Sequence, residues 1–332
     1  MVSVTIVTWN SARYLEECFA ALAKQDYRDL DVVIVDNASE DGTRALLREV
    51  EAKWRVIYNE KNVGFAAGQN QAIRTSRCNY VLCLNPDVVL SPNFITQLMA
   101  SAGESCFDAG VFCGKLLRWD PATENHKTNI IDSTGIYFTR NMRHLDRGAE
   151  EIDRGQYDRP QYVFGASGAA AFFRRSFIDD VSVEGEFFDE EFFAFREDAD
   201  LAWRGQVMGW KCLYVPTAVA WHVRRVTPER RENLPLIINW HSAKNRFLMR
   251  GKNASGWLCW RLFFPVAWRD LMTFGYAVVR DRRLWSAVTY WWRARDGVRR
   301  KRAIIQSRRR VSDRDLLWWF SDDPRAIDAE KQ

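Results

Sequence analysis

Three compact polar clusters follow short apolar runs near the start of the chain. They are Thr8-Trp9-Asn10, Asp36-Asn37 and Asn85-Pro86-Asp87. A carboxylate held at a strand end can bind Mg²⁺ or Mn²⁺, and such an ion can bridge a diphosphate. Asp87 suits this role, whereas Asp36 suits a hydrogen bond to a base or a ribose. Both clusters also have an ordinary explanation, because Asn, Pro and Asp are common in turns and Asp often caps a helix.

A second acidic group, Glu197-Asp198, opens a helix that we predict over residues 197–208. A carboxylate beside a pocket can take the proton from an attacking hydroxyl, and we assign this role to Asp198. Acidic residues are also common in a first helical turn simply because they suit the helix dipole. Asp200 and Arg204 have the i, i+4 spacing of an ion pair, which stabilises the helix in either case.

Two further signals are weaker on their own. His222 follows Trp221 and a short apolar run, and it could bind a metal, although a lone histidine is more often structural. The small residues of Gly165-Ala166-Ser167-Gly168 would let a ligand or another backbone approach closely. Close packing within the sheet explains this second signal equally well.

The elements that must position these groups alternate along the first part of the chain. Apolar runs predict strands at residues 2–7, 31–35, 54–58 and 80–84, and helical patterns predict helices at 11–24, from 43 onward, and at 66–76. Such alternation implies a parallel sheet with right-handed crossovers. Ligands bind beyond the carboxyl ends of the strands in such sheets, so the three polar clusters should share one site.

The pattern changes after about residue 109, where strands are joined by longer loops. We expect strands at 111–117, 135–140, 162–174 and 211–215, and beyond about residue 227 the chain reads as helical almost to its end. The predicted fold class is therefore α/β, with a mostly parallel central sheet and a C-terminal α-helical extension.

Length and composition allow one large domain with an appendage, or two small domains. The chain has 332 residues, of which 47% are hydrophobic and 27% charged, so the whole is not a membrane bundle. The seven cysteines form no CxxC pair, which favours reduced, mostly buried thiols in a cytosolic protein. We expect neither a signal peptide nor a membrane span, because no basic stretch or long uncharged apolar run is present.

The C-terminal region differs in charge from the rest. Residues 251–310 contain 15 Lys and Arg against three Asp, and eight of the 15 tryptophans lie between Trp257 and Trp319. The basic clusters 299–302 and 308–310 beside these aromatics favour an in-plane helix on an anionic membrane surface. One alternative is a helical lid that packs on the core with a solvated basic face. Nucleic acid is disfavoured, since no known nucleic-acid-binding motif is present.

Together these segments resemble glycosyltransferase family 2, the inverting enzymes of GT-A (Rossmann-like) fold, and are most similar to its bacterial rhamnosyltransferase branch. The resemblance rests on residues 4–10, 33–43, 62–70, 84–87, 165–169, 197–204 and His222, in the family's order. One departure is Asn85, which stands where many members have the first Asp of the metal-binding DxD motif.

The resemblance implies a role for each matching residue. Contacts to the nucleotide sugar are implied for Thr8, Trp9, Asn10, Asp36, Asn37, Asn62, Gly64, Phe65, Asn70, Asn85 and Asp87. Contacts to the acceptor are implied for Gly165, Ala166, Ser167, Trp203 and Arg204. Asp198 would be the catalytic base beside Glu197, and Asp87 and His222 would bind a divalent metal, Mg²⁺ or Mn²⁺.

The implied reaction moves a sugar from a nucleotide-sugar donor to a glycan or polyprenyl-diphosphate-linked acceptor in cell-surface polysaccharide biosynthesis. L-rhamnose from dTDP-rhamnose is the first choice, and UDP-sugars stay open. We expect a catalytic domain over 1–226, with a nucleotide-binding half (1–105) and an acceptor half (106–226), and a membrane-associating helical region over 227–332. The protein would then be cytoplasmic and peripheral on the inner face of the membrane, and a homodimer is left open.

Three other readings compete with this one. A non-catalytic nucleotide-binding module could use the basic tail to reach a membrane or nucleic acid, and it would bind a donor without turnover. A nucleic-acid-binding protein would need a recognition motif that is missing. A nucleotidyltransferase would need a glycine-rich, basic phosphate loop, and Thr8-Trp9-Asn10-Ser11 is not one.

Overall fold

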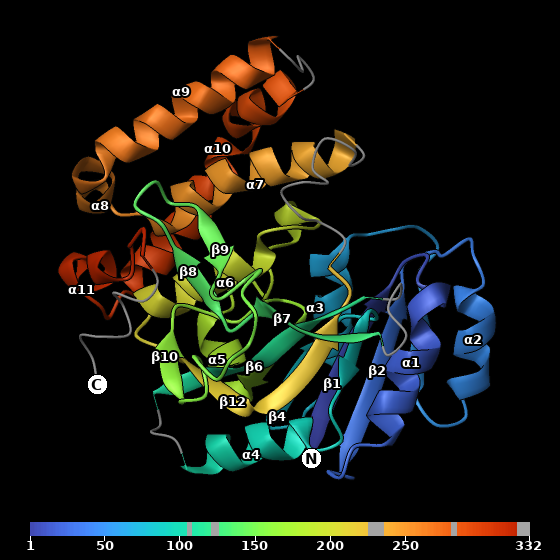
Figure 1. Cartoon of the computed structure of the whole chain (residues 1–332). Coiled ribbons are helices and arrows are strands. Elements are labelled where there is room, and N and C mark those ends of the chain that lie inside the picture. Colours follow the sequence, from blue (N-terminus) through green and yellow to red (C-terminus); the bar gives the residue numbers. More distant parts are fainter. Residues whose placement is uncertain (105–107, 121–125, 225–235, 280–283, 324–332) are drawn as a thin grey trace.

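The computed structural model describes residues 1–104, 108–120, 126–224, 236–279 and 284–323, and a large twisted sheet forms its centre (Figure 1). Within the described residues the sheet has the strand order β10-β12-β6-β11-β4-β1-β2-β3, with β5 paired to β12 and β7 to β6. This is the α/β architecture of the GT-A fold, and its parallel block lies at the N-terminal end of the chain.

The parallel block contains β1 (Val2–Thr8), β2 (Leu30–Asp36), β3 (Arg55–Tyr58) and β4 (Tyr80–Leu84). Its connections are the helices α1 (Ala12–Ala23), α2 (Thr43–Val50) and α3 (Phe65–Thr75). Ile6 of β1 faces the core shared with α1, and Val7 faces the small core beneath α3. Both faces of β1 are therefore covered, which explains why every residue of the strand is buried, Ser3 and Thr5 included.

The second half of the chain extends the same sheet and adds a separate two-stranded sheet, formed by residues 136–138 and 144–146. The elements are β5 (Val88–Leu90), α4 (Phe94–Glu104), β6 (Ala109–Trp119), β7 (Lys127–Ser133), β8 (Ile136–Phe138), β9 (His144–Asp146), β10 (Gln161–Val163), β11 (Ala170–Arg174), α5 (Arg175–Val181), a short 3₁₀ turn (Glu190–Phe192), α6 (Glu197–Val207) and β12 (Lys211–His222). Strand β11 runs antiparallel between β4 and β6, whereas β12 is parallel to β6.

Two predicted strands have wrong bounds. The predicted strand over residues 162–174 is two strands, β10 and β11, which belong to different parts of the sheet. A Cβ on Gly165 would lie 2.2 Å from the Cβ of Ala202. The segment that joins β10 to β11 therefore packs directly against α6 instead of continuing the strand. The strand predicted to end at Val215 continues to His222, because a shift in register between Val215 and Val219 absorbs the interruption at Pro216.

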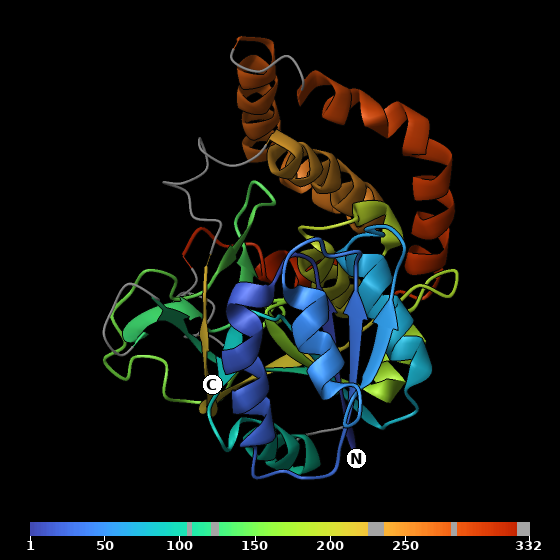
Figure 2. The same cartoon turned by 90° about the vertical axis from the view of Figure 1, so that its right-hand side faces the viewer.

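The C-terminal helices pack around the sheet, and most of them lie above the edge where β1 and β2 end (Figures 1 and 2). They are α7 (Leu236–Asn253), α8 (Gly256–Arg261), α9 (Phe263–Val279), α10 (Leu284–Ser307) and α11 (Asp313–Trp318). Residues 227–235 of the predicted helical region lie outside the described residues. Among those that are described, no helix combines the length and the apolar character needed to cross a bilayer.

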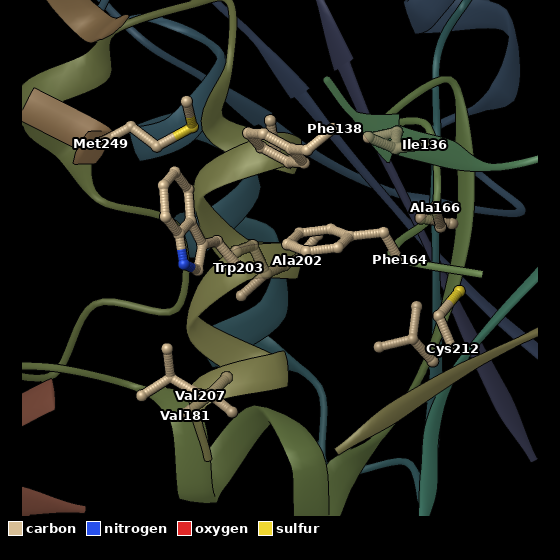
Figure 3. Close-up of a cluster of buried hydrophobic side chains, with 14 of the residues drawn as sticks. Ile136, Phe138, Phe164, Ala166, Val181, Ala202, Trp203, Val207, Cys212 and Met249 are labelled. Carbon is tan, nitrogen blue, oxygen red and sulfur yellow. The ribbon is translucent and has the colours of Figure 1, made fainter. Parts of the chain in front are cut away.

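The core joins the C-terminal helices to the sheet domain. Met249 of α7, Trp203 of α6 and Phe138 of β8 point toward one another in a single apolar cluster (Figure 3). Phe320, just after α11, closes the cluster, with its ring centroid 5.1 Å from that of Trp203. The helical region is therefore packed into the fold and is not a separate appendage.

The cysteines behave as the sequence predicts where they are described. Cys18, Cys78, Cys83, Cys113 and Cys212 are buried and free, while Cys259 is free and exposed. Cys106 lies outside the described residues.

Candidate functional site

Asp36, at the end of β2, lies buried at the bottom of the site. Its Oδ1 accepts hydrogen bonds from the Thr8 hydroxyl at 3.1 Å and the Ser39 hydroxyl at 2.5 Å. Its Oδ2 accepts from Arg44 Nε at 2.7 Å. The carboxylate is fully buried, so it ties β1, β2 and α2 together beneath the open edge. Thr8 and Asp36 thus shape the site from below.

Trp9 and Asn10 directly follow Thr8 at the end of β1. The Asn10 backbone adopts φ +50°, its N–H donates to the Ser39 hydroxyl at 2.9 Å, and its Oδ1 accepts from Glu40 N–H at 2.8 Å. The Trp9 side chain is 56% exposed. A large exposed ring at a strand end offers a surface on which a base or sugar can stack.

The loop before α3 is fixed against the other side of the site. Asn37 Nδ2 donates to the Gly64 carbonyl at 3.0 Å, and Asn62 Oδ1 accepts from Gly64 N–H at 2.9 Å. Gly64 has φ +91°, and a Cβ there would lie 2.6 Å from the Phe193 carbonyl oxygen. Only glycine fits this close approach. The sequence motif around Gly64 therefore positions the segment that leads to Asp198.

Asp87 and His222 come together although 135 positions separate them in the sequence. Strand β5 pairs with the end of β12, with His222 opposite Val88, which places the two side chains side by side. His222 Nε2 lies 3.6 Å from Asp87 Oδ1, and its Nδ1 lies 2.8 Å from Asp132 Oδ2. The predicted pairing of Asp87 with His222 is thus present in the fold.

Buried Asp132 and the partly buried Arg224 and Asp146 form a charge network around His222 that the sequence analysis missed. Arg224 donates to Asp132 Oδ1 at 3.1 Å and also pairs with Asp146. Burial lowers the pKa of His222, but Asp132 and Asp87 outweigh it and raise that pKa to about 10. No motif marks these partners, because β7, β9 and β12 meet only in three dimensions.

Asp198 lies at the start of α6, where two backbone groups hold its carboxylate. Gly168 N–H donates to Oδ2 at 3.0 Å, and Ala199 N–H donates to Oδ1 at 2.7 Å. Burial raises the pKa of Asp198 above its ordinary value. Burial and the neighbouring Asp198 together raise the pKa of Glu197 to about 8. A carboxylate with a raised pKa is a stronger base, which suits proton abstraction.

The chain that leads into α6 is strained. Phe193, Phe195 and Arg196 all have positive φ angles, between 63° and 71°. Such conformations cost non-glycine residues about 1–3 kcal/mol each and persist only where the surroundings enforce them. The Asn245 side chain of α7 contacts three carbonyl oxygens of this segment, and Arg196 Nε donates to the Ser242 carbonyl at 2.8 Å. Helix α7 therefore fixes the approach to Asp198.

Comparison with known proteins shows the family of this chain. The sequence model described as Glycosyl transferase family 2 matches residues 3–181. The chain belongs to this family. Over 308 residues it is 26% identical to the N-acetylglucosaminyl-diphospho-decaprenol L-rhamnosyltransferase of Mycobacterium tuberculosis, covering 85% of the chain and 96% of the relative. It is also 30% identical to an N-acetylglucosaminyltransferase of Mesorhizobium japonicum over 229 residues, 66% of the chain and 50% of that relative.

Solved structures show the same fold at low sequence identity. Residues 1–349 of S. aureus TarS superpose with a TM-score of 0.54 at 15% identity, covering 92% of this chain and 90% of that one. GalNAc-T7, solved with UDP, GalNAc and Mn²⁺, gives a TM-score of 0.57 at 14% identity, covering 76% and 48% of the two chains. These likenesses establish the GT-A fold for this glycosyltransferase.

Asp87 and His222 fit a divalent metal as two of its ligands. Two donors about 2.0–2.2 Å from one ion can lie 3.6 Å apart at an ordinary coordination angle. When Nδ1 of His222 carries the proton toward Asp132, Nε2 keeps a lone pair, as in a carboxylate–histidine–metal arrangement. The described residues contain no group of three or more His, Cys, Asp or Glu that could hold a metal.

Asn85 directly follows β4, two residues before Asp87. Its backbone N–H donates to the Ala169 carbonyl at 2.8 Å. Its Oδ1 is buried and has no hydrogen-bond partner among the described residues. A buried oxygen without a partner is costly, so it suits a ligand group or an ion at this position.

Several residues that were predicted to contact ligands serve the packing instead. Asn70 is buried, and its amide makes two hydrogen bonds with the backbone of Phe188, at 2.8 and 2.9 Å. The Phe65 ring packs on Phe188. Trp203 is fully buried, and Arg204 donates to two carbonyl oxygens within the core. Asn70, Trp203 and Arg204 present no surface to a ligand, so we no longer propose direct contacts for them.

The segment Gly165-Ala166-Ser167-Gly168 lies next to the predicted base. Gly165, Ala166, Gly168 and Asp198 line the same small cavity. Gly165 and Ala166 are buried, whereas Ser167 is half-buried. Of these residues Ser167 is the one whose side chain has surface to offer an acceptor, and this role stays a prediction.

Proposed function

We propose that this family 2 enzyme transfers a sugar with inversion from a nucleoside diphosphate to a hydroxyl of a glycan acceptor. The observation that carries the proposal is Asp198, a carboxylate of raised pKa held by two backbone N–H groups at the start of α6. The strand ends with Trp9 and Asn10 would bind the nucleotide, and Asp198 would accept the proton of the attacking hydroxyl.

The proposed leaving group is the nucleoside diphosphate. Asp87 and His222 would hold Mg²⁺ or Mn²⁺, whose charge would balance the charge that grows on this diphosphate. The protein residues orient the two reactants, which lowers the entropic part of the barrier. Asn85 Oδ1 would accept a hydrogen bond from the donor or coordinate the ion.

The finer specificity follows the relative from Mycobacterium tuberculosis, whose name contains L-rhamnosyltransferase and a diphospho-decaprenol acceptor. We propose L-rhamnose from dTDP-rhamnose as the first donor to test and UDP-sugars as the second. The acceptor would be a polyprenyl-diphosphate-linked glycan at an anionic membrane surface on the cytoplasmic side, in cell-surface polysaccharide synthesis. A homodimer stays an open prediction.

A thermal-shift screen with nucleoside diphosphates and their sugars, with and without Mn²⁺, tests the proposal. A ligand that binds the folded state raises the melting temperature. We expect a shift with dTDP or UDP that Mn²⁺ enhances in the wild type but not in Asp87→Ala. A donor that binds but is never turned over with any glycan acceptor would favour the non-catalytic module. A folded protein that no nucleotide stabilises would overturn both readings.

A further inference from the structure

Helix α9 (Phe263–Val279) turns its polar side chains toward the protein. Asp270 pairs with Arg246 at 2.5 Å and with Arg250 at 2.7 Å, both on α7. Arg246 also donates to the Thr273 hydroxyl at 3.0 Å, and Arg269 donates to Asn141 Oδ1 at 3.0 Å. These contacts fix which face of α9 lies against the protein.

The opposite face of α9 is apolar and exposed. Phe264 is 83% exposed, Trp268 66% and Val279 80%, and the exposed set also includes Leu271, Met272 and Val278. Their spacing of three and four residues places them along one side of the helix. A surface helix in water normally has the reverse arrangement. A contiguous apolar face of this kind marks an interaction site.

The neighbouring helix α8 continues this surface. Trp260 is 73% exposed, and Trp257 and Phe263 are exposed beside it. Arg261 at the end of α8 is exposed as well. Asp270 is the only acidic residue of residues 256–279, and it is paired on the inner side. The outer face therefore combines aromatic and aliphatic side chains with a positive charge and no negative one. This composition matches the boundary between anionic headgroups and acyl chains.

The basic clusters, which the sequence analysis assigned to the membrane, are largely used inside the protein. Lys301 pairs with Glu186 and Asp189 at 2.7 Å each. Arg302 donates to the Gly251 carbonyl at 2.9 Å. In the second cluster Arg308 donates to the Ser182 carbonyl, and Arg310 pairs with Asp180 at 2.8 Å. These side chains attach the end of α10 to the catalytic domain, so the lipid-facing surface must be sought elsewhere.

We propose that the outer face of α8 and α9 lies in the plane of an anionic bilayer, with Phe264, Trp268, Leu271 and Met272 in the headgroup–acyl boundary. The helices lie on the side of the molecule toward which β1 and β2 run, so this orientation turns the catalytic edge toward the lipid surface (Figures 1 and 2). That this orientation brings the catalytic edge to a lipid-linked acceptor rests on the proposed function. Lipid binding itself needs no nucleotide and no turnover.

The test uses the full chain and flotation with vesicles of phosphatidylcholine alone or mixed with phosphatidylglycerol. The outer-face variant carries Trp268→Gln, Leu271→Gln and Met272→Gln, all tolerated in an exposed helix. Ile152→Gln, which removes another exposed apolar side chain, is the matched control. We expect the wild type and the control to bind mixed vesicles, and the outer-face variant to bind at least about 100-fold more weakly. Lipids brominated on the acyl chains should quench tryptophan fluorescence in the wild type.

Three outcomes would overturn the proposal. The wild type could fail to bind mixed vesicles, or the outer-face variant, with its melting temperature unchanged, could bind as well as the control. The third is a wild-type dimer in sedimentation that the outer-face variant converts to a monomer without any change in vesicle binding, which would make this face an interface between copies. All samples are free of nucleotide sugar, so a failure of the transferase assignment leaves these results interpretable.

Discussion

The side-chain nitrogen of Asn245, in α7, lies 2.7 Å from the carbonyl oxygen of Phe195, three residues before the predicted base Asp198. The same nitrogen lies 2.9 Å from the carbonyl oxygens of Phe192 and Ala194. The Asn245 amide thus donates to three carbonyl oxygens of a segment whose backbone is strained. Among the described residues the hydrogen bonds of the Asn245 side chain all go to this segment, so we expect Asn245 to affect catalysis by positioning the segment that leads to Asp198.

Asn245→Ala should lower kcat by about 10- to 100-fold while the KM for the donor changes little. The loss of buried hydrogen bonds should also reduce the free energy of unfolding by about 1–3 kcal/mol. Initial-rate kinetics and urea unfolding measure the two effects. Asn79→Ala, at an exposed asparagine, is the control and should match the wild type. A variant that loses donor affinity as strongly as turnover would show that Asn245 supports the whole domain and not this segment.

The parallel half of the fold could be predicted because its signals are local. Strands β1, β2 and β4 are mostly apolar, and each is followed by a polar cluster that the sequence displays. The pairing of Asp87 with His222 was available only by resemblance, since β5 and β12 meet through sheet topology. Asp132 and Arg224 left no local signal at all.

The C-terminal helices show a second limit of sequence reasoning. Basic clusters look alike whether they bind lipid or carboxylates of the same chain, and Lys301 and Arg310 do the latter. The opposite orientation of α9 depends on where Arg246 and Arg250 lie on α7, which no periodicity reveals. The amphipathic pattern gives a helix two faces but does not say which one faces the protein.

Asp198→Asn should reduce kcat by about 10²- to 10⁴-fold, the usual contribution of a general base. Asparagine keeps the size of the side chain and can still accept from Gly168 N–H, so donor affinity should stay within about twofold. Calorimetric donor titration and single-turnover transfer measure these quantities. Asp179→Asn, on the exposed surface of α5, is the control. Near-normal turnover in Asp198→Asn would assign the base to another group.

Glu197 predicts a specific pH dependence of stability. Its pKa is raised to about 8 by burial and Asp198, whereas an unfolded Glu titrates near 4.5. The folded state therefore binds the proton more tightly, and the stability that this provides is present below about pH 4.5 and lost as pH rises toward 8. In Glu197→Gln the free energy of unfolding should fall by about 1 kcal/mol or more less than in the wild type as the pH rises toward 8. Urea unfolding at pH 5, 6, 7 and 8 tests it, and parallel curves for variant and wild type would contradict it.

Asp132→Asn should weaken the metal dependence without removing a direct ligand. The Asp132 carboxylate lies 2.8 Å from His222 Nδ1, opposite the nitrogen that faces Asp87. Loss of such a partner typically costs about 10- to 100-fold in metal affinity. The Mn²⁺ concentration that half-maximally enhances the UDP or dTDP thermal shift should rise by this factor. Asp29→Asn, at an exposed carboxylate, should leave it unchanged, and an unchanged value for Asp132→Asn would place the ion elsewhere.

Lys252 joins α7 to the catalytic domain through two buried carboxylates. Its Nζ pairs with Asp189 and lies 3.1 Å from Asp200 Oδ2, and all three side chains are buried. Lys252→Met should cost about 3–5 kcal/mol of unfolding free energy, because two buried carboxylates each lose one of their two cationic partners and keep only Lys301 or Arg204. Lys24→Met, at an exposed lysine, should cost less than about 0.5 kcal/mol. Urea unfolding at pH 7 measures both.

The pH profile and a double variant distinguish lost charge pairing from lost packing. Although burial alone would raise it, Lys252 and Lys301 hold the pKa of Asp189 well below its ordinary range. The stability from this pairing is therefore present above the unfolded pKa of Asp and lost as pH falls through the folded value. The free energy of unfolding of Lys252→Met should therefore fall less steeply than that of the wild type as the pH is lowered. Adding Asp189→Asn to Lys252→Met should recover part of the stability, since it removes a buried negative charge that has lost one of its two cationic partners. Strictly additive losses would mean that Lys252 stabilises the α7 contact through its aliphatic stem alone.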